Sequence, residues 1–207
     1  MSLRIAVLIS GSGTNLQALI DRIADGTLDV SIELVISSRS DAFGLQRAAE
    51  AGIQTVALSK ELFDQPETAD AVLCSLLKRA EVDLVVLAGY MRKIGPYVLM
   101  SYPNHVVNIH PSLLPSFIGA HAIDEAYDYG VKVTGVTVHL ANGSYDRGPI
   151  VAQRALAIEQ HWTRDELEAH IHEIEHQLYP EVIQLFAENR VHVLEDNRVV
   201  IDEMSAE

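Results

Sequence analysis

Five nearly continuous apolar runs, most of them separated by helix-like segments, constrain the fold of this chain more than any other feature. The runs occupy residues 4–10, 31–37, 82–89, 105–110 and 133–140. Such runs are typical of strands that are buried on both faces, and strands that alternate with helices are typical of a parallel sheet. The sequence therefore predicts an α/β fold with a doubly wound, mostly parallel, Rossmann-like sheet.

Helical periodicity supports this prediction. In residues 14–26, Leu16, Leu19, Ile20 and Ile23 fall at i, i+3, i+4 and i+7, ahead of a glycine that is a typical helix stop. Similar segments follow at 42–52 and 67–80, and a long helix at 164–189 precedes a short hairpin at 191–202. Because no internal repeat or linker interrupts this pattern, we expect a single domain over residues 1–207, with a frayed acidic tail after Asp202.

Charge and hydropathy exclude several classes of partner. The chain has 15 Lys and Arg against 29 Asp and Glu, a formal charge of −14, whereas nucleic acids are bound by surplus basic residues. We therefore expect no nucleic-acid partner, and any anionic substrate must be held by local, directed groups. No apolar run reaches the roughly 18 residues of a membrane helix, so we expect a cytoplasmic protein without membrane contact. The single cysteine, Cys74, lies in a helical run and is expected to be an inert core thiol.

A glycine-containing loop, "ISGSGTNLQ", joins the first predicted strand to the first predicted helix. Its glycines expose backbone N–H groups at a helix N-terminus, an arrangement that suits a phosphate. The dinucleotide fingerprint is incomplete because Leu16 stands at the third glycine position, and no Gly-Lys-Ser/Thr follows as in a P-loop. The alternative is a tight turn whose side chains only cap the helix.

An Asn-Ile-His tripeptide ends the fourth apolar run. Residues two apart on a strand project from the same face, so Asn108 and His110 should face one space. Pro111 places the pair at the carboxyl end of its strand, the edge where ligands bind in open α/β sheets. An amide donor beside an imidazole suits a reaction in which an oxyanion develops while a proton moves. The alternative is a hydrogen-bonded core histidine beside an asparagine that satisfies loop backbone.

A carboxylate could complete this pair. Asp146 follows the strand that ends near Leu140 and precedes a new strand after Pro149. If the loop returns to the same edge, Asp146 can bond the imidazole of His110 and raise its pKa. No serine or cysteine nearby has a nucleophile signature, which favours direct transfer over a covalent enzyme intermediate. The alternative is an aspartate that only forms a turn before Gly-Pro.

Five segments taken together carry a resemblance to a known family: "ISGSGTNLQ", "LAGYMRKI", "NIHPSLLPSFIGAH", "DRGPI" and "EHQLYP". In this order the chain resembles the folate-dependent phosphoribosylglycinamide formyltransferases of purine synthesis, from Arg4 to about Arg190. The resemblance implies one formyltransferase domain with a phosphate-binding half at 1–100 and a catalytic and folate half at 101–190. The hairpin and tail at 191–207 follow.

The resemblance also implies a reaction and its residues. A formyl group would pass from 10-formyltetrahydrofolate, the co-substrate, to the amine of glycinamide ribonucleotide by direct attack through a tetrahedral intermediate, with no metal. Asn108, His110 and Asp146 would be the catalytic trio. The implied substrate-binding residues are Gly13, Thr14, Asn15, Pro111, His172 and Glu175, and the implied folate-binding residues are Met91, Arg92, Lys93, Ile94, Asn108 and Asp146. A homodimer is compatible with this assignment. The resemblance further suggests a cis bond between Leu114 and Pro115.

Some positions depart from the family pattern. Pro66 stands about where a basic residue often meets the folate tail, Ser116 and Ile118 replace frequent Lys and Pro, and the loop at 142–147 is less acidic.

Three other enzyme classes and one binding class compete with the main hypothesis. The "HEIEH" segment matches a short metalloprotease motif. Methionyl-tRNA formyltransferase would need an RNA-binding domain, and formyltetrahydrofolate deformylase would normally carry a regulatory domain before the first strand. A non-enzymatic nucleotide-binding module would leave Asn108, His110 and Asp146 unexplained.

Overall fold

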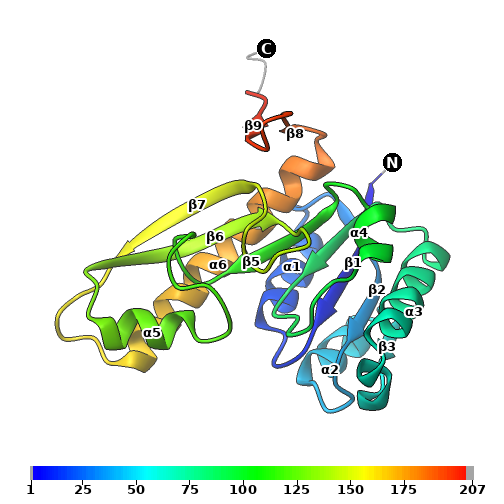
Figure 1. Ribbon diagram of the computed structural model, residues 1–207, viewed down its shortest axis with the longest axis horizontal. Coiled ribbons are helices and arrows are strands. Elements are labelled where there is room, and N and C mark those ends of the chain that lie inside the picture. The colour runs from blue at the N-terminus through cyan, green and yellow to red at the C-terminus, as the bar shows by residue number, and fades with distance from the viewer. Residues whose placement is uncertain (1, 204–207) are drawn as a thin grey trace.

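A seven-stranded sheet forms the centre of the molecule (Figure 1). The computed structural model describes residues 2–203. The strands run in the order β3-β2-β1-β4-β5-β6-β7. Their bounds are β1 Leu3–Ile9, β2 Val30–Ser37, β3 Thr55–Ala57, β4 Leu84–Leu87, β5 Val106–His110, β6 Val133–Leu140 and β7 Ile150–Ala157. Strands β1 to β5 are parallel, and β6 and β7 are added antiparallel. The predicted fold class is confirmed.

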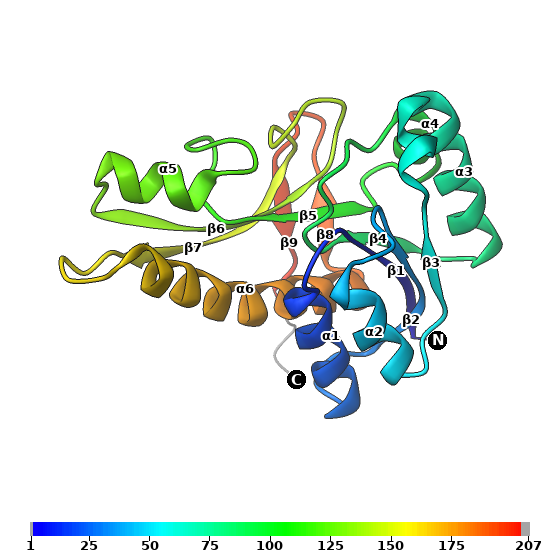
Figure 2. The same ribbon diagram turned by 90° about the horizontal axis from the view of Figure 1, so that it is seen from below.

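Helices cover both faces of this sheet. They are α1 Thr14–Ala24, α2 Phe43–Glu50, α3 Pro66–Arg79, α4 Pro96–Ser101, α5 Ala122–Tyr129 and α6 Arg164–Ala187, with a 3-10 helix η1 at Lys60–Asp64. In Figure 2, α1, α2 and α6 lie on one side of the sheet and α3 and α4 on the other. Helix α6 begins at a capping box, in which Thr163 and Glu166 satisfy each other's backbone N–H groups.

The core has two layers because successive strand residues point to opposite faces. In β1, Ile5, Val7 and Ile9 join the layer beneath α1 and α6. Ala6 and Leu8 join the layer beneath α3. The near-continuous apolar runs of the sequence therefore arise because both faces of the sheet are covered.

A small hairpin follows α6. Strands β8 Val191–Val193 and β9 Val199–Ile201 form a two-stranded sheet whose apolar side chains pack against the α1–α6 layer, as predicted. The predicted frayed tail falls mostly on residues 204–207, outside the described residues. Between residues 2 and 203, no helix has the length and hydropathy needed to cross a membrane.

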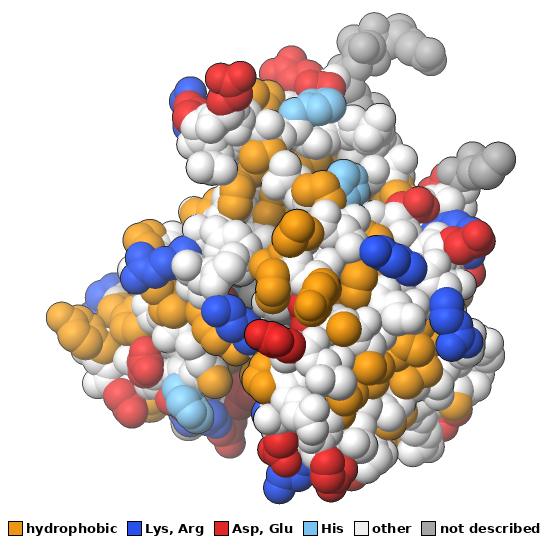
Figure 3. Space-filling view, turned by 45° about the vertical axis from the view of Figure 1, so that its right-hand side comes forward, with side chains coloured by type: hydrophobic (Ala, Val, Ile, Leu, Met, Phe, Trp, Pro, Cys, Tyr) orange, Lys and Arg blue, Asp and Glu red, His pale blue; other side chains and the backbone are white. Residues whose placement is uncertain are grey.

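The molecular surface mixes charges of both signs. On the face in Figure 3, Lys and Arg side chains are scattered among acidic and apolar ones rather than gathered into one basic area. An anion that reaches this face therefore depends on local groups, as the net charge already indicated.

Candidate active site

The candidate site lies at the carboxyl ends of the central strands. The loops at 10–13, 88–95 and 111–121 follow β1, β4 and β5, which are neighbours in the sheet. The strand order reverses between β1 and β4, and ligands of open α/β sheets bind at such a point. Topology thus brings segments that are far apart in the sequence to one edge.

A cavity of about 350 Å³ opens at this edge. Eight residues singled out in the sequence line it: Met91, Arg92, Lys93, Ile94, Asn108, His110, Pro111 and Asp146. Gly13, Thr14, Asn15, His172 and Glu175 are not among its lining residues. They form a second group at the start of α1 and the middle of α6, where Asn15 Nδ2 donates to Glu175 Oε2 at 3.1 Å.

His110 is almost fully enclosed, with 4% of its surface exposed. Its Nε2 lies 2.7 Å from the Phe117 carbonyl oxygen and donates to it, which leaves Nδ1 facing Asp146 Oδ2 at 3.6 Å. That distance suits an ion pair but is long for a hydrogen bond. Asp146 Oδ2 also accepts the Gly119 N–H at 3.0 Å. The imidazole and the carboxylate thus lie side by side, as expected. At 3.6 Å they are close enough for an ion pair when His110 is protonated but too far apart for a hydrogen bond.

The pKa of His110 differs from the prediction. Burial lowers the pKa of His110, and this effect exceeds the opposing effects of the Phe117 carbonyl and the Asp146 charge. The predicted net rise is therefore wrong. Asp146 raises the pKa of His110, as predicted. The free-energy penalty for desolvating an imidazolium is larger than the stabilisation that the one carboxylate provides. The pKa of Asp146 itself is lowered, first by the adjacent His139 ring and then by His110 and Gly119.

His139 is a site residue that the sequence analysis missed. It lies on β6 directly opposite Asn108 on β5, is 2% exposed, and its Nε2 lies 3.0 Å from Asn108 Nδ2. Its Nδ1 faces the Leu140 carbonyl at 3.0 Å, and its Nε2 lies 3.6 Å from Asp146 Oδ1. The only signal in the sequence was a lone histidine in an apolar strand, and its partner depends on the β5–β6 register.

Two residues of the neighbouring loops have left-handed backbone conformations. Phe117 and Asp146 both have φ of 50°. Residues other than glycine, asparagine and aspartate rarely adopt this backbone conformation. Residues that do adopt it cluster at functional sites. Between Leu114 and Pro115 the peptide bond is cis, which confirms that prediction. The glycine of the "DRGPI" segment, Gly148, is needed because a Cβ there would collide with the Leu140 carbonyl oxygen.

The glycine loop is held against α2. Gly13 is the N-cap of α1, with φ of 71°, and no side chain caps the helix, so the first N–H groups of α1 remain available to an anion. The side-chain cap of the alternative is therefore absent, and the phosphate role of the loop stays a prediction. A Cβ on Gly13 would lie 2.6 Å from Gly44 Cα, whereas a Cβ on Gly11 would meet open space.

Glu175 is a buried carboxyl group, 5% exposed, on α6. Burial raises its pKa to about 7, and the hydrogen bond from Asn15 opposes this rise. His172 Nε2 lies 3.9 Å from Glu175 Oε2, and the rings of His172 and His176 are stacked. Over residues 2–203, no group of three His, Cys, Asp or Glu side chains has a metal-binding arrangement. The metalloprotease alternative therefore finds no third ligand beside the "HEIEH" segment.

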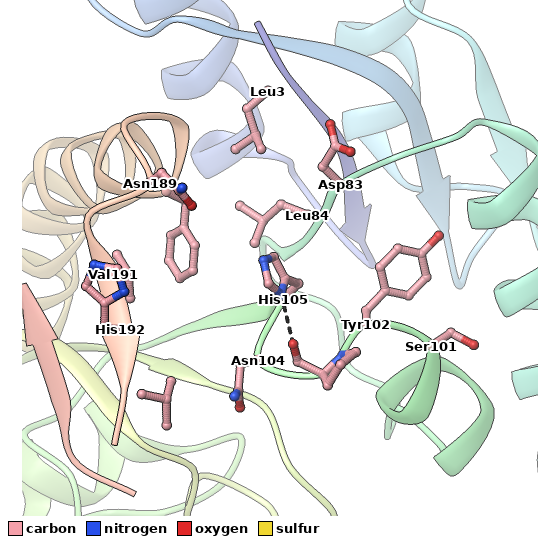
Figure 4. A pocket seen from close by; sticks show the side chains of 13 residues that line it. Leu3, Asp83, Leu84, Ser101, Tyr102, Asn104, His105, Asn189, Val191 and His192 are labelled. Carbon is pink, nitrogen blue, oxygen red and sulfur yellow. Dashed lines mark hydrogen bonds between the residues drawn. The ribbon is translucent and has the colours of Figure 1, made fainter. Parts of the chain in front are cut away.

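A larger hollow of about 630 Å³ lies elsewhere, at the amino ends of β1 and β4 (Figure 4). Leu3, Asp83 and Leu84 line it on one side and His192 on another, and the His105 ring bonds the Pro103 carbonyl. It includes none of the residues singled out in the sequence. Chemical composition, not size, therefore selects the cavity at the carboxyl edge.

A family profile described as "Formyl transferase" matches residues 3–183. The chain belongs to this family. Phosphoribosylglycinamide formyltransferase of Haemophilus influenzae is 42% identical to this formyl transferase over 200 residues, covering 96% of this chain and 93% of that protein. The Bacillus subtilis protein of the same name is 38% identical and covers 87% of this chain and 93% of its own length. Glycinamide ribonucleotide transformylase 1 from Symbiobacterium toebii is similar in structure, with a TM-score of 0.93 and 44% identity, covering 98% of this chain and 95% of that one.

Proposed function

We propose that this formyl transferase moves a formyl group from 10-formyltetrahydrofolate to the amine of glycinamide ribonucleotide. The observation that carries the proposal is the cavity in which Asn108, His110 and Asp146 lie beside the 91–94 segment. Relatives that carry the corresponding enzyme name span nearly the whole chain. An apolar cavity with a few convergent polar groups suits a ligand that has ring systems with polar edges, such as a folate.

In the proposed reaction, the neutral amine attacks the formyl carbon, and negative charge develops on the formyl oxygen. Asn108 supplies an N–H donor to this oxygen, an interaction that strengthens as charge develops. The amine nitrogen must lose one proton and the departing folate nitrogen must gain one. His110 and Asp146 relay this proton between them, so that no net proton is gained or lost.

The surroundings of His110 set a condition on this mechanism. Its Nε2–H is directed to the Phe117 carbonyl, and its Nδ1 faces Asp146. Direct contact between Nε2 and the formyl oxygen requires the Phe117 carbonyl to be displaced. Proton uptake at Nδ1 requires no such movement and produces an imidazolium that faces a carboxylate.

The ribonucleotide would lie across the second group of residues. Gly13, Thr14 and Asn15 would hold the phosphate, and His172 and Glu175 the ribose and glycinamide portion. The contact between Asn15 and Glu175 supports one continuous site from the glycine loop to α6. In this scheme residues 1–100 supply the phosphate loop and residues 101–190 the catalytic groups. Met91, Arg92, Lys93 and Ile94 would meet the folate.

A formyl-transfer assay with glycinamide ribonucleotide and 10-formyltetrahydrofolate tests this function. Formation of formylmethionyl-tRNA and hydrolysis of the folate serve as parallel controls. We expect transfer to the ribonucleotide to dominate, and dominant folate hydrolysis would assign the chain to a different reaction.

A homodimer and a cytoplasmic location are also proposed. Tyr97 and Met100 of α4, which are 52% and 81% exposed, support an interface on that helix. Sedimentation velocity tests the dimer, and cell fractionation tests the location.

A further inference from the structure

Arg47 of α2 contacts the carbonyl side of the glycine loop. Its Nε donates to the Ser12 carbonyl oxygen at 2.9 Å, and its Nη1 donates to Gln17 Oε1 at 3.1 Å. Its guanidinium also lies over the Phe43 ring, 4.9 Å from the centroid. These three partners are uncharged. Gln17 in turn donates to Asp21. The Asp21 carboxylate is therefore connected to the guanidinium only through Gln17.

The same helix holds two successive carbonyl groups of the loop. Gly44 N donates to the Gly11 carbonyl at 3.1 Å, and Arg47 holds the Ser12 carbonyl. In a trans peptide the C=O and the following N–H point in opposite directions. The N–H groups of Ser12 and Gly13 are therefore directed away from α2, and consecutive N–H groups arranged in this way form an anion-binding concavity.

A cation at the carbonyl end of a peptide unit strengthens the N–H at its other end as a donor, because hydrogen bonds polarise one another. The guanidinium also places positive charge near the loop in a chain whose formal charge is −14. Both effects favour a bound dianion, and neither requires Arg47 to touch it.

We propose that Arg47 is a positioning residue for the phosphate of the ribonucleotide. It holds the Ser12 carbonyl, directs the Gly13 N–H away from α2 and toward the phosphate, and adds positive charge beside the loop. This inference rests on the proposed function, since it concerns the same ribonucleotide.

The test compares ligands with and without the phosphate. Arg47→Met removes the charge but keeps an unbranched stem over Phe43, and Arg47→Lys keeps the charge without the planar fork. Arg79→Met, at an exposed position of α3 on the other face of the sheet, is the matched control for loss of one positive charge. Calorimetric titration measures the affinity of each variant for glycinamide ribonucleotide and for its dephosphorylated riboside.

We expect Arg47→Met to weaken ribonucleotide binding about 10-fold, the effect of one charge several ångström away at a partly hydrated surface. Riboside binding by Arg47→Met and ribonucleotide binding by the Arg79→Met control should be unchanged. Arg47→Lys should retain more ribonucleotide affinity than Arg47→Met. The amide resonance of Gly13 should shift in both Arg47 variants. If the Met variant does not fold, Arg47→Gln carries the same comparison.

Equal weakening of ribonucleotide and riboside would overturn the inference, because it would mean that Arg47 only braces the loop. Unchanged ribonucleotide affinity would overturn it as well. Both outcomes differ from failure of the proposed function, in which the unaltered protein itself would not bind the ribonucleotide.

Discussion

His110 combines two opposing environments within one side chain. Burial lowers its pKa, while Asp146 and the Phe117 carbonyl raise it. Because the folded state takes up the proton less readily than the unfolded chain, His110 costs no stability well above its ordinary pKa, near 6.5. The cost appears as the pH falls through that value toward the folded-state pKa. In the proposed reaction His110 gains a proton, and its lowered pKa keeps the unliganded ring neutral near pH 7.

The first prediction concerns the Asp146 charge. Asp146→Asn removes one of the groups that raise the pKa of His110, so this pKa should fall further below its ordinary value. Titration of the His110 ring followed by NMR measures the change. His121→Ala, which removes an exposed histidine next to Asp124, is the control. A His110 pKa that stays constant or rises would contradict the proposed charge contact.

The second prediction concerns the amide of Asn108, the proposed oxyanion donor. Asn108→Ala should leave the affinities for both substrates nearly unchanged and lower kcat by about 10²-fold or more, because the amide acts mainly on charge that develops in the transition state. Steady-state kinetics with binding titrations separate the two effects. Asn142→Ala controls for altered cavity shape, since Asn142 lines the same cavity but donates to the Arg147 carbonyl. A raised KM at constant kcat would assign Asn108 to ground-state binding.

The third prediction concerns Glu175 and stability. Its folded-state pKa of about 7 lies above the ordinary value of 4.5, so the folded protein prefers the protonated form. The stability from this group is full below its ordinary pKa and is lost as pH rises through about 7. Glu175→Gln, a neutral mimic, should raise the free energy of unfolding at pH 8 by at most on the order of 3 kcal/mol and have little effect near pH 4. Urea unfolding measures this, with exposed Glu173→Gln as control, and a pH-independent difference would count against it.

At the scale of elements, the packing of the glycine loop against α2 decides which of its glycines can be substituted. Gly13→Val, an obvious sequence-based test of phosphate binding, would drive a side chain into Gly44 and disturb α2. Gly11 is the better position, since a Cβ there has no neighbouring atom within 4 Å.

The fourth prediction follows from that open space. Gly11→Val should weaken ribonucleotide binding at least 10-fold, because its side chain would occupy the space beside the N–H groups of α1. Folate binding and the melting temperature should change little. Gly143→Val is the matched control, since a Cβ at Gly143 also has no neighbour within 4 Å. Calorimetry with each ligand decides, and equal loss of both ligands would sink the phosphate assignment.

Elements with long, strong patterns were predictable from the sequence, and short ones were not. The buried runs of β1, β2, β4, β5 and β6 and the periodic segments of α1, α3 and α6 carry their own signals. Strand β3, with three residues, and helix α4, with six, are set by their neighbours: β3 pairs with β2, and Asp70 of α3 accepts the N–H groups of Gly95 and Tyr97. His139 was missed for the same reason, since its meaning depends on pairing between two strands.

At the scale of the whole molecule, the sequence indicated where the site would be but not how deeply it would be buried. The Asn-Ile-His order places two side chains on one face, and that inference needs only strand geometry. The sign of the His110 pKa depends on how many atoms from distant segments surround the ring. A local sequence pattern does not show how deeply the ring is buried. The predicted pKa of His110 was therefore wrong in sign.

Ser10 connects the two proposed substrate-binding regions through one hydroxyl group. Its Oγ accepts the Met91 N–H at 2.8 Å and lies 2.6 Å from Ser38 Oγ, so one hydroxyl joins the end of β1, just before the glycine loop, to the 91–94 segment. Ordering of either segment by its own ligand should therefore prepare the other, and the two ligands should share a coupling free energy that is equal in both directions.

The fifth prediction measures that reciprocity. In the unaltered protein each ligand should tighten the binding of the other by the same factor, and Ser10→Ala should reduce both factors equally because it leaves Met91 N–H without its acceptor. Ser38→Ala keeps the Met91 contact and should reduce them less. Calorimetric titration of each ligand, alone and with a non-reactive analogue of the other, closes the thermodynamic cycle. If the two ligands bind independently in the unaltered protein, the Ser10–Met91 hydrogen bond does not couple their binding sites. With linkage, whichever substrate binds first tightens the binding of the other by the same factor.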